Sequence, residues 1–99
     1  MTKTIELNGN YTFEFNGFSR NTTVQDGKLV SNAYVTLKDP TAAQIDELRG
    51  LALYTITGLR LLVDGDPIYA LTNLEAKITS LDESVSEYGT MTCSMYMNL

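Results

Sequence analysis

A period of two in the placement of apolar residues limits the possible folds of this chain more than any other feature. Tyr11, Phe13 and Phe15 are separated by polar residues, so their side chains fall on one face of an extended strand. The stretch 90–99 shows the same pattern, with apolar residues at every second position from Met91. Such stretches predict strands that bury one face and leave the other in water.

Four dipeptides that favour tight turns separate these stretches: Asn8-Gly9, Asn16-Gly17, Asp26-Gly27 and Asp64-Gly65. Asparagine, aspartate and glycine tolerate the positive φ angles of two-residue hairpin turns, so we expect a turn at each. The strand expected over residues 28–38 has apolar residues on both faces, and we expect it to be covered on both sides.

The periodicity changes to that of a helix in the middle of the chain. Thr41 and Gln44 have the spacing of a capping box, in which each side chain bonds a backbone N–H at the start of a helix. Ile45 and Leu48 follow at helical spacing. We therefore expect one amphipathic helix near residues 41–54.

That helix should end between Gly50 and Thr55, after which strand signals return. A short strand is expected over residues 59–63, a long one over 68–81 with a bend near Asn73, and a polar loop over 82–89.

This order of elements indicates an α+β fold, a mainly antiparallel sheet of about six to seven strands that packs one helix. We expect a small sandwich or half-barrel. Ninety-nine residues allow a single globular domain, 1–99.

The composition argues against an enzyme. The chain has no histidine, which is the commonest general base and metal ligand, and only one cysteine. Asp64 and Asp66 flank a glycine, but Pro67 and Ile68 follow where a calcium loop needs more oxygen ligands, so a turn is the better interpretation. We expect no catalytic residues, no metal, no cofactor and no small-molecule substrate.

The net charge of −5 argues against nucleic acid and anionic membrane surfaces as partners. The negative charge gathers in the second half, where Asp82, Glu83 and Glu87 lie close together in sequence. These three acids are candidate contact residues for a basic protein. The corresponding alternative function is a small acidic inhibitor or adaptor, phage-encoded, that binds a host protein.

No stretch of the sequence has the length and apolar character of a signal peptide or a membrane span. We therefore expect a protein of the cytoplasm or of a virion.

The strand over 90–99 provides the first interaction hypothesis. Met91, Met95 and Met97 share one face, and Tyr96 lies on the other. Methionine adapts to irregular surfaces and recurs at interfaces, although it also fills cores. No charge or proline blocks this strand, so we expect it either in the middle of the sheet or paired with an oligomeric partner.

Threonine- and asparagine-rich strands, glycine turns and a single helix make the chain resemble small structural proteins of tailed phages, including tail and head–tail connector components. The resemblance covers the order of elements along the whole chain. It implies a non-catalytic assembly protein that self-associates or binds a protein partner through strand edges and an apolar face.

Overall fold

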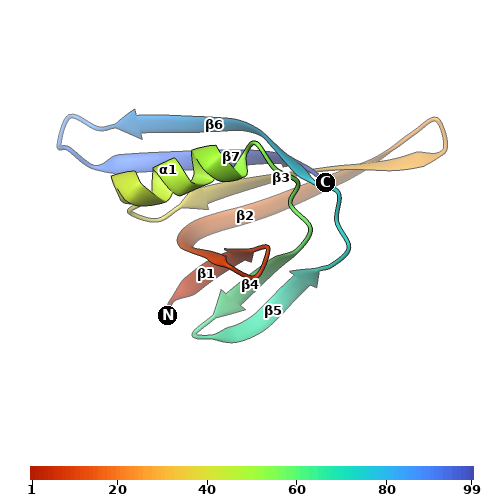
Figure 1. Ribbon diagram of the computed structural model, residues 1–99, viewed down its shortest axis with the longest axis horizontal. Coiled ribbons are helices and arrows are strands. Elements are labelled where there is room, and N and C mark those ends of the chain that lie inside the picture. The colour runs from red at the N-terminus through yellow and green to blue at the C-terminus, as the bar shows by residue number, and fades with distance from the viewer.

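The computed structural model describes residues 1–99, which form one seven-stranded antiparallel sheet and one helix (Figure 1). The elements in chain order are β1 (Lys3–Leu7), β2 (Tyr11–Gln25), β3 (Lys28–Leu37), α1 (Ala42–Leu51), β4 (Leu59–Val63), β5 (Asp66–Leu71), β6 (Lys77–Val85) and β7 (Met91–Asn98). The strand order across the sheet is β5-β4-β1-β2-β3-β7-β6. The predicted α+β fold with a mainly antiparallel sheet is confirmed.

The long strand β2 belongs to both halves of the sheet. Its first residues pair with β1, and after a bulge between Phe15 and Gly17 it continues as the partner of β3. A bulge bends a strand and increases its twist. The sheet therefore folds over on itself, as a half-barrel does, and its two halves face each other across the core.

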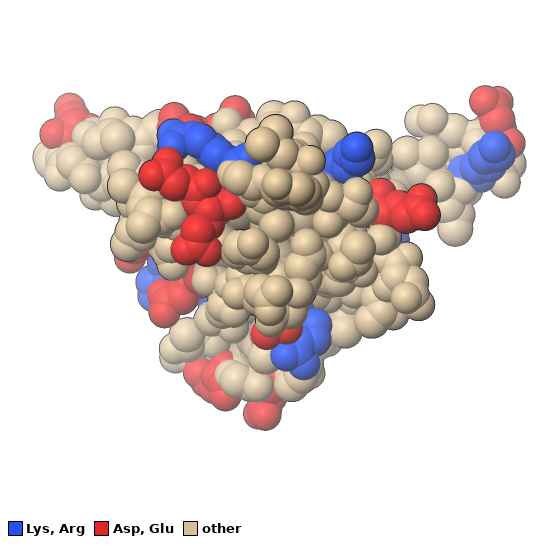
Figure 2. Space-filling view, in the orientation of Figure 1, with Lys and Arg blue, Asp and Glu red and all other residues tan.

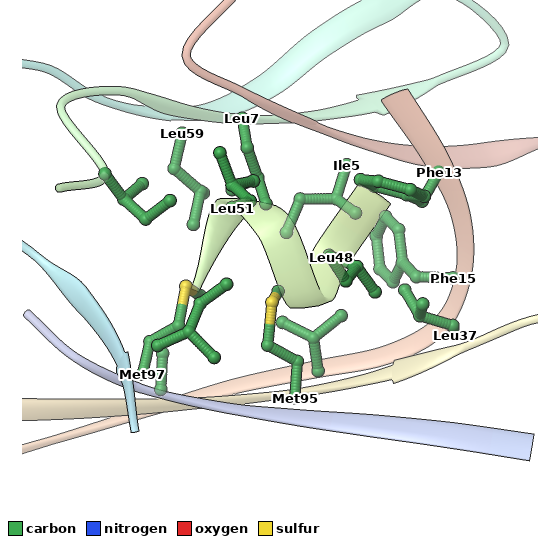
Figure 3. Packing of buried hydrophobic residues seen from close by; sticks show 14 of the residues in the cluster. Ile5, Leu7, Phe13, Phe15, Leu37, Leu48, Leu51, Leu59, Met95 and Met97 are labelled. Atoms are coloured by element: carbon green, nitrogen blue, oxygen red, sulfur yellow. The ribbon is translucent and has the colours of Figure 1, made fainter. Parts of the chain in front are cut away.

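The core lies between these halves and beside the helix. Figure 3 shows Leu7 and Leu59 on one side, Met95 and Met97 on the other, and Leu48 of α1 between them. Eighteen buried apolar residues form this single cluster. Alternation along the strands supplies most of them, because only every second side chain points inward, and α1 adds Ile45, Leu48 and Leu51.

Helix α1 begins as the sequence predicts. Thr41 Oγ1 accepts a hydrogen bond from the Gln44 backbone N–H at 3.1 Å, and Gln44 Oε1 accepts one from the Thr41 N–H at 3.0 Å. Ile45, Leu48 and Leu51 are buried against the sheet. At ten residues α1 is too short to cross a membrane, and it is the one helix of the chain.

The side chain of Asn8 links the β1–β2 turn by hydrogen bonds to the segment that leads into β4. Its side-chain oxygen accepts hydrogen bonds from the backbone N–H groups of Thr57, at 2.7 Å, and Gly58, at 3.4 Å. Its side-chain nitrogen donates to the Thr55 carbonyl at 3.3 Å. One left-handed residue, with φ of 54°, thus joins segments about fifty residues apart in sequence.

Three of the four expected turns are present, and the fourth prediction is wrong. Asn16-Gly17 lies inside β2, where it forms the bulge, and Gly17 does not have a positive φ. The dipeptide has the composition of a turn, but the neighbouring Phe15 and Phe18 continue pairing with β3. Pairing across the sheet therefore overrides the local turn preference.

Two expectations for the second half are corrected. The stretch 68–81 is not one bent strand, because the chain leaves β5 after Leu71 and begins β6 at Lys77, on the opposite edge of the sheet. Asn73, with φ of 55°, lies in that connection. Residues Asp82–Val85 are not loop but the end of β6, where they pair with β7. Polar side chains fit there because that part of β6 is exposed.

Strand β3 is not covered on both sides as expected. Ser31, Ala33, Val35 and Leu37 are buried, but Asn32 and Tyr34 on the other face are exposed. Leu29, which by alternation shares the face of Ala33, Val35 and Leu37, is 76% exposed because β3 begins beyond the edge of the core.

Candidate functional site: a projecting hairpin arm

The most distinctive surface feature is the far end of the β2–β3 hairpin, which projects from the body (Figure 1). β1 pairs with β2 only as far as Glu14, and β7 pairs with β3 only from Asn32 onward. The hairpin beyond these contacts, residues 22–31, is termed the arm. It lengthens the molecule to 47 Å along its longest axis.

The arm is held to the body at its base by hydrogen bonds of side chains. Arg20 donates to the hydroxyl of Tyr69 in β5 at 3.0 Å and to the hydroxyl of Ser31 at 3.2 Å. Thr22 and Ser31 share a further bond of 2.8 Å between their hydroxyls. Phe18 packs on Tyr69, with ring centroids 5.7 Å apart. These contacts direct the arm away from the core.

The arm ends in a tight turn beside two exposed apolar side chains. Asp26 and Gly27 have φ angles of 52° and 75°, as a two-residue type I′ turn requires. Val24 and Leu29 pair across the strands and are 70% and 76% exposed. Figure 2 shows that the visible face of the arm is uncharged except near its tip, where Asp26 and Lys28 lie.

The arm also leaves one edge of β2 without a neighbouring strand. Residues 19–25 have β3 on one side and no strand on the other. They include no proline, and Arg20 is their single charged residue. Proteins generally block open edges with charges, proline or bulges, because an open edge can pair with another chain.

The two outer edges of the sheet carry such blocking features. β5 begins with Asp66 and Pro67, and proline cannot donate a hydrogen bond to a further strand. β6 carries Lys77, Asp82 and Glu83. The arm edge of β2, which carries Arg20 alone, is therefore the least protected of the long strand edges.

The structure places the methionines of the C-terminal strand inside the protein. β7 lies between β3 and β6, so it is central rather than an edge. Met95 and Met97 are buried in the core and cannot form a surface in the folded chain, and Met91 is half-buried. The central position, one of the two alternatives drawn from its lack of charge, is the observed one.

Cys93 lies on the same buried face of β7. Burial raises the pKa of its thiol, and the nearby carboxylate of Glu83 raises it further. A raised thiol pKa disfavours the reactive thiolate.

Tyr96 lies on the outer face of β7, next to Tyr34 of β3. The two ring centroids are 4.8 Å apart, and each residue is 37% exposed. A hydrogen bond with Ser94, 3.2 Å between the hydroxyl oxygens, lowers the pKa of Tyr34, whereas loss of hydration raises the pKa of Tyr96. The pair forms a small aromatic patch on an otherwise polar face.

The acidic residues 82, 83 and 87 are not brought together. Asp82 pairs with Ser94 and Glu83 with buried Cys93, so the two carboxylates lie on opposite faces of the sheet. Glu83 is bonded to Arg49 of α1, which also bonds Asp46. Glu87 lies in the β6–β7 turn. Adjacent positions in a strand separate these charges, and Arg49 neutralises one of them.

The surface has one hollow, of about 190 Å³, between the end of α1 and β6. It is smaller than the several hundred cubic ångströms of typical ligand pockets. The structure groups no three acidic or cysteine side chains in a way that could hold a metal ion. Asp64 and Gly65 form the expected turn between β4 and β5, and Asp66 begins β5.

The sequence pattern did not predict the arm, because Asn16-Gly17 has the composition of a turn and lies inside the strand that carries the arm. Arg20 and Thr22 lie on the face that is buried further back along β2, and neither is apolar. When the core-facing positions of a predicted strand change from apolar to polar residues, the pattern indicates that the strand continues past the end of the hydrophobic core.

No protein-family model matches this chain, and no curated protein matches it.

Proposed function

We propose that this protein is a non-catalytic structural or assembly protein that joins another protein chain through its arm. The observation that carries this proposal is the open edge of β2, residues 19–25, which carries one charged residue and no proline, in a molecule whose outer strand edges carry more blocking residues. Its free backbone groups can accept an added strand, a common mode of protein recognition.

The exposed apolar pair at the end of the arm supports the same conclusion. Val24 and Leu29 each gain about 1.5–3 kcal/mol when a partner removes them fully from water. The hydrogen bond from Arg20 to Tyr69 also favours binding, because an arm that is already held in place loses less conformational freedom when a partner binds.

A virion component, in a phage tail or head–tail connector, is the specific class that we propose. The order of strands and helix resembles those proteins, and the projecting arm offers a point of attachment for a neighbouring subunit. A component of this kind should co-purify with virus particles in a fixed ratio to the other structural proteins, and its absence from purified particles would contradict the virion assignment.

Site-specific photo-crosslinking in the native host cell tests the role of the arm. A photoreactive amino acid replaces Thr23 in one variant and Leu53 in the other. Both positions are exposed, but Leu53 follows α1, outside the arm. We expect discrete products from position 23, with the linked chain identified by mass spectrometry, and none from position 53. Absence of an arm-specific product would refute the proposed function.

A further inference from the structure

We infer that the partner of the arm is a second copy of this chain, bound by antiparallel pairing of the two β2 edges about a two-fold axis at Thr23. This inference rests on the proposed function and names the partner. The two arms then form one four-stranded ribbon, with the two bodies at its opposite ends.

The hydrogen-bond pattern of the hairpin shows which backbone groups are available. Gln25 and Lys28 flank the two-residue turn and therefore bond each other. Alternation along β2 then turns the N–H and C=O groups of Arg20, Thr22 and Val24 away from β3. The carbonyl of Ser31, opposite Thr22, points away from β2 in the same manner and accepts a bond of 2.9 Å from the Leu99 N–H.

This pattern suits pairing of β2 with itself. An axis at Thr23 places Thr22 of one copy opposite Val24 of the other, and both residues have free backbone groups. They form two doubly bonded pairs, one on each side of the axis. The two Thr23 residues face each other as a pair without hydrogen bonds, in which side chains approach most closely.

Charge favours this register and a second copy as the occupant. Opposite positions add to 46 in residue number, so Arg20 of each copy lies opposite Asp26 of the other. The pairing thus brings together two pairs of opposite charges. Arg20, the one charged residue of residues 19–25, contributes to each pair. Like charges directly opposite would destabilise the ribbon.

The apolar side chains also meet in this arrangement. Val24 and Leu29 lie on the same face of the arm, because they are directly opposite across its two strands. The two-fold axis brings both pairs to one face of the ribbon, where the Val24 side chains are diagonal neighbours. The two Val24 side chains therefore shield each other in part, and each keeps the Leu29 of its own chain on its other side.

Disulfide trapping tests the axis. In a Thr23→Cys variant the two new thiols face each other, while Cys93 is buried and supplies no accessible thiol. We expect the disulfide-linked dimer to form at least about tenfold faster than in the matched variant Leu53→Cys, because pairing raises the effective concentration of the thiols. Equal rates in the two variants would overturn the inference.

Mixing two variants tests the register. Asn21→Cys and Gln25→Cys lie opposite each other only across copies, so each alone should link slowly and an equimolar mixture quickly. Both positions are exposed and lie on the same face of β2 as Thr23. A mixture that links no faster than the separate variants would exclude this register.

A proline substitution tests the role of the backbone. Thr22→Pro removes an N–H that points away from β3, so the hairpin keeps its own bonds while the new edge is blocked. Thr22→Val loses the same hydroxyl but keeps the N–H, and is the matched control. By sedimentation velocity we expect Thr22→Pro to remain a monomer at concentrations where Thr22→Val and the unmodified chain dimerise.

The failure of this inference differs from the failure of the proposed function. A purified chain that stays monomeric up to about 1 mM overturns self-pairing. If the photoreactive residue at position 23 then links to a different protein, the assembly function stands and only the identity of the partner changes.

Discussion

The guanidinium of Arg20 donates a hydrogen bond of 3.0 Å to the hydroxyl of Tyr69, which joins the base of the arm to β5 across 49 residues of sequence. Tyr69 also packs against Phe18, which lies in β2 near Arg20. The direction of the arm therefore depends on an edge strand that does not pair with it.

Replacing Tyr69 with phenylalanine should loosen the arm without unfolding the protein. The ring contact remains and one exposed hydrogen bond is lost, so the free energy of unfolding should fall by no more than about 1 kcal/mol. Amide hydrogen exchange over residues 22–31 should accelerate. Tyr54→Phe is the matched control, because Tyr54 is exposed and its hydroxyl makes no hydrogen bond. Unchanged hydrogen exchange in the arm would show that the Arg20–Tyr69 hydrogen bond does not hold the arm in place.

Replacing Met95 with alanine should cost about 2–5 kcal/mol of unfolding free energy, since it leaves a cavity in a closely packed core. Met91→Ala on the half-buried end of the same strand should cost distinctly less. Urea denaturation of both variants measures the difference. Equal losses would mean that the face of β7 is not packed as described.

Replacing Thr41 with alanine removes the side chain that caps α1 and should cost about 1 kcal/mol. Glu47→Ala changes an exposed position of the same helix and should stay within about 0.5 kcal/mol of the unmodified chain. Thermal unfolding followed by circular dichroism compares the two. A larger effect at Glu47 than at Thr41 would rule out the capping box as a source of stability.

The two outer tyrosines should lose their protons in a fixed order. Hydrogen bonding with Ser94 lowers the pKa of Tyr34, so this residue adds stability once the pH exceeds its unfolded pKa. Loss of hydration raises the pKa of Tyr96, so its contribution is present below its unfolded pKa and is lost as the pH rises through the folded value. Carbon NMR of labelled tyrosines, assigned with Tyr34→Phe and Tyr96→Phe, should show Tyr34 ionising first, and the reverse order would refute this account.

Cys93 should resist thiol reagents while the chain is folded and react fully in denaturant, because burial both shields the thiol and raises its pKa. Absorbance during reaction with an aromatic disulfide measures the accessible thiol. The Leu53→Cys variant is the positive control, since position 53 is exposed. Rapid modification of Cys93 in the folded protein would contradict its burial.

Local patterns were sufficient to predict the parts of the fold that depend on nearby residues. The Thr41–Gln44 capping box predicted the start of α1, and the alternation from Met91 onward put Cys93, Met95 and Met97 on one face of the last strand, which the structure shows to be buried. Both signals act within one turn or one strand.

Features that depend on distant pairing could not be predicted in the same way. Asn16-Gly17 has the composition of a turn, and only the pairing of Phe18 with Val35 shows that the strand continues. The strand order that makes β7 central is a property of the whole sheet, so the sequence left that position open. The arm was missed for the same reason, because its exposure depends on where β1 and β7 end.

The central position of β7 has a consequence for biosynthesis. It is the last of the seven strands to leave the ribosome, yet it separates β3 from β6 and pairs with both. Until Met91–Asn98 emerge, β6 has no partner and the apolar face of β3 is incomplete. The sheet therefore closes only after these residues are translated, and until then Val35 lacks its pairing partner Met95.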